Sequence, residues 1–186
     1  APVSVGVDEE CDTQSAKTVC PQGAECFITN PLLEQVPHCH MTGSGCPPEW
    51  STLNMNDQLI GANQWQYNGD HNLQEAHWGD HGQGTCEAWV STGFNDLYEF
   101  TIPSNGNYAI YTYAFGATDT FMFVRSDCGV TTADAELACN DDEPGPPDSG
   151  AHLNNQAAGD TIYIFVDSSG AGGRGSYGLE INYLGQ

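Results

Sequence analysis

The sequence predicts an all-β protein, with an antiparallel β-sandwich preceded by a small disulfide-rich module. Short runs of alternating apolar and polar residues recur after residue 90, each bounded by Gly, Asp, Asn or Ser. No stretch carries a convincing helical period. Five of the eight cysteines fall within the first 46 residues. That segment has too few apolar residues to build a core, so disulfides must replace burial there.

The composition indicates a folded domain with an acidic surface. Lys and Arg number 3 and Asp and Glu 25, which gives a formal net charge of −22. Nucleic acid and anionic lipid headgroups need basic partners and are therefore excluded, whereas divalent cations, polycations and neutral surfaces remain. The hydrophobic set makes up 39% and the aromatic set 10% of the residues, which is enough for a core. A length of 186 residues suits one sizeable domain, with or without a small satellite.

The cysteines and the first residues predict a secreted protein. Eight cysteines without a CxxC pair favour disulfides in an oxidising compartment over a structural zinc site. The initial Ala-Pro is interpreted as the mature end left after signal-peptide cleavage. No apolar run approaches the ~18 residues that a membrane span needs. We therefore expect an extracellular or cell-surface protein without membrane insertion.

Cysteine spacing divides the chain into an arm (residues 1–10), a cysteine-rich module (residues 11–46) and a sandwich (residues 47–186). The module holds Cys11, Cys20, Cys26, Cys39 and Cys46, and the sandwich holds Cys86, Cys128 and Cys139. Four of the first five could pair among themselves, which leaves Cys46 to bond Cys86. Cys128 would then close on Cys139. Eight cysteines allow ~105 connectivities, so spacing alone leaves the pairing open.

Alternating runs place the strands of the sandwich. In "NDLYEFTIP", Tyr98, Phe100 and Ile102 occupy every second position. The turn "SNGN" follows and "YAIYTYAF" continues the alternation, so residues 96–115 are predicted to form a hairpin. Later runs predict strands over residues 120–126, 161–169 and 176–184. Several short strands separated by turns are typical of an antiparallel sandwich.

Five blocks in this order resemble the bacterial pre-peptidase C-terminal (PPC) domain family over roughly residues 53–185. The blocks are "NDLYEFTIPSNGNYAIYTYAF", "ATDTFMFVRSDCG", "ELACNDD", "AGDTIYIFVDSSG" and "GSYGLEINY". The resemblance implies a jelly-roll-like β-sandwich that accompanies secreted proteins, often proteases, as a non-catalytic accessory. Many such domains bind calcium. The resemblance also implies that Cys128 pairs with Cys139. The first 46 residues lie outside it and resemble only loosely an EGF-like or other small cysteine-rich module.

The stretch "ELACNDDEPGPPDS" (residues 136–149) is the predicted calcium site. Calcium takes about 6 to 8 oxygen ligands, and an irregular acidic loop offers carboxylates and free carbonyls. The implied bridge would hold Asp141 and Asp142 beside the strand that begins after Asp119, so these three are the first-choice ligands. Further candidates are Asp96, Asp148 and Asp167. The alternative is that these aspartates only cap turns, but like charges packed this closely favour a cation.

A second constellation, "GDHNLQEAHWGDHG" (residues 69–82), is interpreted as a solvated polar loop. Its nitrogen and oxygen ligands would be enough for zinc or copper. Gly79 between His77 and His81, and the absence of the HExxH order, favour the loop. The candidate ligands are Asp70, His71, Glu75, His77, Asp80 and His81. Elsewhere, His38 and His40 flank a cysteine that is expected to form a disulfide.

Aromatic residues gather between residues 50 and 90. Their members are Trp50, Trp65, Tyr67, Trp78 and Trp89. Such rings can stack on the pyranose faces of a polysaccharide. The interpretation favoured here is that they pack in or against the sandwich, because large aromatics supply burial where aliphatics are scarce.

Catalysis finds little support in the sequence. There is no GxSxG elbow, no zincin motif and no Gly-rich phosphate loop. Carboxylates are plentiful enough for a glycosidase pair, but Asp141 and Asp142 already have the explanation given above. We expect a non-catalytic structural protein, stabilised by calcium, because these 186 residues hold no catalytic domain for an accessory to assist. The alternative is a carbohydrate- or protein-binding accessory module of a secreted enzyme system.

The N-terminal "VSVGV" predicts a strand with one apolar face, formed by Val3, Val5 and Val7. Such an arm can pair with its own chain, or it can add to an open sheet edge of the next subunit. Head-to-tail contacts of the second kind do not close and generate filaments. Calcium between acidic surfaces would offset the repulsion between subunits that each carry −22. The prediction is a secreted homopolymer, with the intramolecular strand as its competitor.

Overall fold

The computed structural model describes residues 3–4, 18–19, 24–27, 38–41, 46, 50–70, 78–79, 84–86, 95–116, 118–130, 135–143, 145, 147–168 and 175–186. Strands dominate these residues, so the predicted all-β class is confirmed. They form two compact units: Ala1–Glu49 with Asp127–Thr131, and Trp50–Ser126 with Thr132–Gln186. The segment Asp127–Thr131, expected in the sandwich, thus groups with the first unit. No helix in the described residues is long and apolar enough to cross a membrane.

The first unit holds two short strand pairs. β1 (Val3–Ser4) pairs in parallel with β2 (Thr18–Val19) of the same chain. β3 (Ala24–Phe27) pairs antiparallel with β4 (His38–Met41), with Cys26 opposite Cys39. The other predicted residues of this region lie outside the described part of the chain: Val5, Val7, Cys11, Cys20 and the side chains of His38 and His40.

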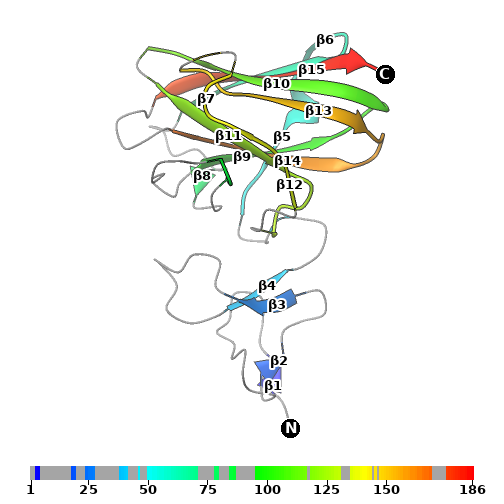
Figure 1. The fold of residues 1–186 in the computed structure, drawn as a ribbon. Coiled ribbons are helices and arrows are strands. Elements are labelled where there is room, and N and C mark those ends of the chain that lie inside the picture. The colour runs from blue at the N-terminus through cyan, green and yellow to red at the C-terminus, as the bar shows by residue number, and fades with distance from the viewer. Residues whose placement is uncertain are drawn as a thin grey trace. The chain divides into compact units, whose positions relative to one another are not determined.

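The second unit is a sandwich of two sheets, seen facing each other in Figure 1. One sheet has the order β13 (Gly150–Gln156), β10 (Gly106–Ala114), β15 (Ser176–Gly185), β7 (Gln64–Asp70), β6 (Leu59–Gly61). The other has the order β12 (Glu136–Asn140), β11 (Thr120–Arg125), β14 (Thr161–Ser168), β9 (Asn95–Thr101), β5 (Leu53–Asn54), with β8 (Trp78–Gly79) also on β9. A 3-10 helix, η1 (Met55–Gln58), connects β5 to β6. All neighbours are antiparallel except β5 and β9, which confirms the predicted sandwich.

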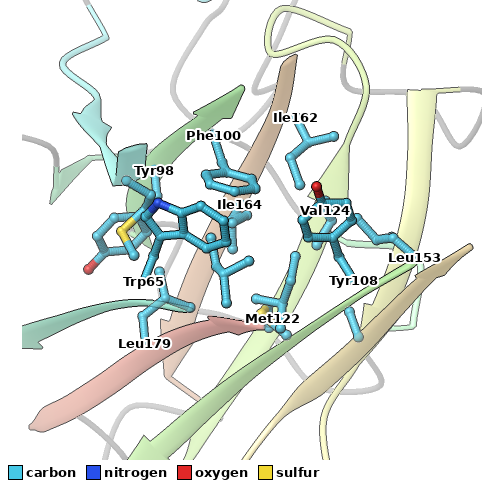
Figure 2. Packing of buried hydrophobic residues seen from close by; sticks show 14 of the residues in the cluster. Trp65, Tyr98, Phe100, Tyr108, Met122, Val124, Leu153, Ile162, Ile164 and Leu179 are labelled. Atoms are coloured by element: carbon cyan, nitrogen blue, oxygen red, sulfur yellow. The ribbon is translucent and has the colours of Figure 1, made fainter. Parts of the chain in front are cut away.

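The core between the sheets is built from every second residue of the facing strands (Figure 2). Trp65 on β7 meets Phe100 on β9 edge to face, with ring centroids 4.8 Å apart. Fully burying one such side chain stabilises the fold by roughly 1.5–3 kcal/mol. Tyr67 packs against the same core, and Trp50 is half-buried. Trp65 and Tyr67 therefore pack in the sandwich, as predicted, and do not form a platform for sugars. The side chain of Trp78 and all of Trp89 lie outside the described residues.

Three predicted strands are confirmed, as β11, β14 and β15, but residues 96–115 do not form a hairpin. β9 pairs with β14 in one sheet, whereas β10 pairs with β13 and β15 in the other. The connection crosses between the sheets, where Ile102 N donates to Asp160 O (2.8 Å) and the Tyr108 hydroxyl donates to Ser104 O (2.8 Å). Period-two alternation marks one buried face per strand. Strands in facing sheets bury the same core as strands in a hairpin, so the pattern does not distinguish them.

The expected disulfides Cys46–Cys86 and Cys128–Cys139 are wrong. Cys46 bonds Cys128 within the first unit, and Cys86 bonds Cys139 within the sandwich, with Cα–Cα distances of 4.6 and 5.6 Å. The strand register explains the difference. Cys139 lies opposite Phe123 inside the sandwich, whereas Cys128 lies beyond the end of β11, in the segment that groups with the first unit.

Peptide mapping of the unreduced protein should therefore recover Cys46–Cys128 and Cys86–Cys139. Cys86–Cys139 spans 53 residues, and restricting a loop of that size in the unfolded chain contributes roughly 4 kcal/mol in the chain-entropy model. Replacing both cysteines by serine should lower the free energy of unfolding by about 2–4 kcal/mol in denaturant titrations. A peptide linking Cys128 to Cys139 would contradict the pairing.

Candidate metal centre

Asp119, Asp141 and Asp142 form the acidic cluster of the sandwich. One carboxylate oxygen from each lies within 4.8 Å of those of the other two. Asp119 directly precedes β11, and Asp141 directly follows β12. Because β11 and β12 are antiparallel neighbours, the start of one lies beside the end of the other. The structure thus brings the three first-choice ligands together through strand pairing, without the bridge that was expected to do so.

A buried hydroxyl network fixes the loop that carries the cluster. The hydroxyls of Thr112 on β10 and Thr120 on β11 share a hydrogen bond of 2.6 Å. Ser149 N donates to Thr112 Oγ1 (2.8 Å), and Ser149 Oγ donates to Asp141 O (3.0 Å). All three hydroxyl residues have no exposed surface. Since Thr120 follows Asp119 and Ser149 holds the Asp141 carbonyl, the network positions carboxylates from both strands.

The electrostatics of the cluster are those of carboxylates without a neutralising cation. Burial, and then repulsion from Asp142, raises the pKa of Asp119 above its ordinary value. Burial, then Asp142, then Asp119, raises the pKa of Asp141 in the same way. Arg125, the one Lys or Arg in the described part of the chain, lies at the other end of β11 over the ring of Phe123, 4.7 Å from its centroid.

A buried oxygen in the cluster has no hydrogen-bond donor. Asp141 Oδ1 is buried without a partner among the described residues, as is Oδ1 of the preceding Asn140. Such an oxygen loses its hydration without compensation, at a cost of about 1–3 kcal/mol. A cation would provide that compensation. The donor set is oxygen only, which suits calcium and not the nitrogen and sulfur preferences of zinc.

The remaining predicted ligands lie outside the cluster and accept hydrogen bonds from the protein. Asp148 Oδ1 accepts from Ala114 N (2.7 Å). Asp96 is fully buried and accepts from the Tyr177 hydroxyl. Asp167 is buried and accepts from Ser168 N (2.6 Å).

In the polar stretch 69–82, Asp70 accepts from Ser176 Oγ (2.7 Å). The other candidate ligands lie outside the described residues: His71, Glu75, His77, Asp80 and His81. The zinc or copper alternative therefore stays a prediction.

Sequence reasoning missed Thr112, Thr120 and Ser149. In the sequence, Thr112 and Thr120 occupy ordinary strand positions and Ser149 ends a turn. The one signal was that Thr120 directly follows a candidate ligand, and this does not reveal that its hydroxyl is buried.

Two solved structures are similar to this chain at low sequence identity. No protein-family model and no curated protein matches the chain. The pre-peptidase C-terminal domain of collagenase from Bacillus anthracis is similar in structure, with a TM-score of 0.44 and 15% identity over 72% of this chain and 96% of that chain. Aeromonas hydrophila PliG, a periplasmic inhibitor of g-type lysozyme, has a TM-score of 0.41 at the same identity and coverage.

The raised pKa values predict an unusual pH dependence for the metal-free protein. A carboxyl whose pKa is raised by folding binds more protons in the folded state, so the free energy of unfolding should fall as pH rises above 3.8, the ordinary value. Asp141→Asn should flatten this slope in chelator-treated samples followed by denaturant titration at several pH values.

Asp160→Asn is the matched control, because it removes the same charge from an exposed position. It should keep the parent slope. A parent slope that Asp141→Asn leaves unchanged would show that the cluster is not its source.

Proposed function

We propose that this protein is a secreted, non-catalytic β-sandwich module stabilised by a calcium ion bound to Asp119, Asp141 and Asp142. The observation that carries the proposal is the convergence of three carboxylate oxygens within 4.8 Å beside a buried, unpartnered oxygen of Asp141. At such a separation each pair of charges repels by about 1 kcal/mol in a water-like medium and about 3 kcal/mol at an effective dielectric constant near 20. A divalent cation would turn this repulsion into attraction.

Residues of the chain would position the three carboxylates, and the ion would supply the positive charge that offsets their repulsion. Thr112, Thr120 and Ser149 already hold the loop through hydrogen bonds that do not involve the carboxylate groups. A bound ion would then join the start of β11 to the end of β12. The expected role of the metal is therefore stability and order of the loop, not chemistry on a substrate.

The disulfides support an extracellular setting for this module. Cys46–Cys128 and Cys86–Cys139 fit an oxidising compartment. Extracellular calcium-binding modules work with dissociation constants of about 10⁻⁴–10⁻³ M, which a site with few carboxylates and a partly exposed position can reach.

Self-association through the N-terminal arm completes the proposal. In the described residues, the pairing of Val3–Ser4 with Thr18–Val19 covers two residues of each strand, and a pair of that size is weak enough to exchange. An acceptor is available at β6, which ends the five-stranded sheet as described and has Leu59 and Ile60 58% and 57% exposed. An apolar edge strand of this kind is a template for strand addition. Filaments would follow from head-to-tail addition.

Calcium removal should lower the thermal midpoint of unfolding. A ligand that binds only the folded state contributes about 2.7 kcal/mol at 100 times its dissociation constant, which corresponds to several degrees. Differential scanning fluorimetry in EDTA and after calcium readdition measures this shift of the thermal midpoint. Asp141→Asn with Asp142→Asn should abolish the calcium response, and Asp160→Asn should retain it. An identical melting curve with and without calcium would refute the site.

Deleting residues 1–7 should leave a folded monomer that no longer assembles in calcium. Light scattering and electron microscopy of the full chain and the deletion measure this. Leu59→Lys should also impair assembly by placing a charge on the acceptor edge, whereas Leu137→Lys, on β12 of the other sheet, should not. A full chain that remains monomeric in calcium at high concentration would favour the accessory-module alternative.

A further inference from the structure

The outer face of the five-stranded sheet carries a row of aromatic side chains. Side chains alternate between the two faces of a strand. Tyr108 and Ile110 of β10 belong to the core. Tyr111 and Tyr113 of the same strand therefore lie on the outer face, and Phe115 continues the alternation just beyond the strand. We call these three residues the aromatic row.

The neighbouring strands place polar side chains beside the aromatic row. Tyr177, Leu179 and Ile181 of β15 belong to the core, so the residues between them face outward. The strand register then aligns three outward sets across β10, β15 and β7: Tyr113, Gly178 and Asn68; Tyr111, Glu180 and Gln66; Ala109, Asn182 and Gln64. One face thus combines two tyrosines with four amide side chains, three from β7 and one from β15, and with Glu180 as its carboxylate.

Gly178 of β15 lies beneath two rings and an amide of this face. A Cβ atom at Gly178 would lie 3.5 Å from Phe115 Cζ, 3.9 Å from Tyr113 Cδ2 and 3.6 Å from Asn68 Oδ1. Gly178 is buried, so the two rings and the amide cover it and lie close to one another. Phe115 is 50% exposed, although a large apolar ring gains from burial.

Several polar groups beside the aromatic row are unused within the described part of the chain. The Tyr113 hydroxyl and the side chains of Gln64, Gln66 and Asn68 have no hydrogen-bond partner there. The far end of the row is held in place, because the Tyr111 hydroxyl and His152 Nε2 share a hydrogen bond of 3.0 Å. The face thus offers rings in fixed positions beside free donors and acceptors.

We infer that this face binds a neutral polysaccharide. Pyranose rings present C–H faces that stack on aromatic rings, and their hydroxyls both donate and accept, as amide side chains do. Same-face residues along a strand are spaced by ~6.7 Å, so the aromatic row extends over ~13 Å, enough for two or three sugar units.

Charge and hydrogen bonding disfavour the other occupants of such a face. A polyanionic glycan would meet Glu180 and a chain of net charge −22, and a second copy of this chain would carry the same charge. An apolar protein surface would strip water from the amides without replacing it, at about 1–3 kcal/mol for each group left unpaired. A neutral chain rich in hydroxyls avoids both costs.

Affinity electrophoresis tests the inference with the full chain. Native gels that contain hydroxyethylcellulose, laminarin, galactomannan or arabinoxylan are the probes, and an alginate gel is the anionic comparison. We expect retardation in at least one neutral gel and none in alginate. Because the face is built by strand pairing, retardation should persist in EDTA as long as the protein remains folded, so it does not depend on the calcium proposal.

Three variants separate the face from the rest of the molecule. Tyr113→Ala and Phe115→Ala should each weaken binding at least tenfold. Gly178→Val should do the same, because its methyl groups would displace the two rings and the amide that cover Gly178, whereas a Cβ alone makes only ordinary contacts there. Leu137→Ala, an exposed apolar residue on the other sheet, should bind like the parent. Where an alanine variant loses its melting transition, Tyr113→Phe replaces it and should weaken binding by loss of the hydroxyl alone.

The inference is overturned by any of three results. These are no retardation of the parent protein in any neutral gel, parent-like binding by all variants that fold, or an equal loss of binding in Leu137→Ala.

Discussion

Three hydroxyl groups at one end of the sandwich have no access to water, and the way they are satisfied determines the path of the chain around them. Thr112 belongs to one sheet, Thr120 to the other, and Ser149 to the loop that returns to β13. A buried hydroxyl without a partner costs about 1–3 kcal/mol, so the three bond to one another and to the backbone. Thr120 N also donates to Pro147 O (3.0 Å), which draws the loop against β11. The acidic cluster is thus a consequence of how the core closes.

The basic residue Arg125 is used for packing on the outer face of the six-stranded sheet. Its guanidinium lies over the rings of Phe123 and Phe165, 4.7 and 4.9 Å from their centroids, and burial lowers its pKa to about 10, so it stays protonated at neutral pH. Residues 84–86 lie across this layer. A Cβ at Gly84 would lie 2.9 Å from Phe123 Cβ, closer than side chains approach, and Cys86 fastens the segment to β12. The position of residues 84–86 against Phe123 and Cys139 explains why Cys139 bonds Cys86.

The sequence predicts the features that depend on local pattern and misses those that depend on which surfaces meet. β11, β14 and β15 alternate strongly and were predicted. β7 is not predicted, because Trp65 and Tyr67 are its two large apolar residues and the Asn68, Gly69 and Asp70 that follow them are typical of turns. The acidic cluster was predictable since Asp119 and Asp141 flank strands that pair. Asp96 and Asp167 look the same in sequence, but both lie within strands, where burial and hydrogen bonds to neighbouring groups occupy them.

The acidic cluster and the aromatic row belong to different sheets, but one loop borders both. Glu143 follows Asp142 directly, and its carboxylate lies 3.6 Å from His152 Nε2, the nitrogen that also bonds Tyr111. The Tyr111 end of the row therefore contacts this loop through His152. Ala114, between Tyr113 and Phe115, donates its N–H to Asp148 Oδ1 of the same loop (2.7 Å). The aromatic row is thus held by the pairing of β10 with β15 and braced by Asp148 and Glu143 of the loop, which are not the three carboxylates of the acidic cluster.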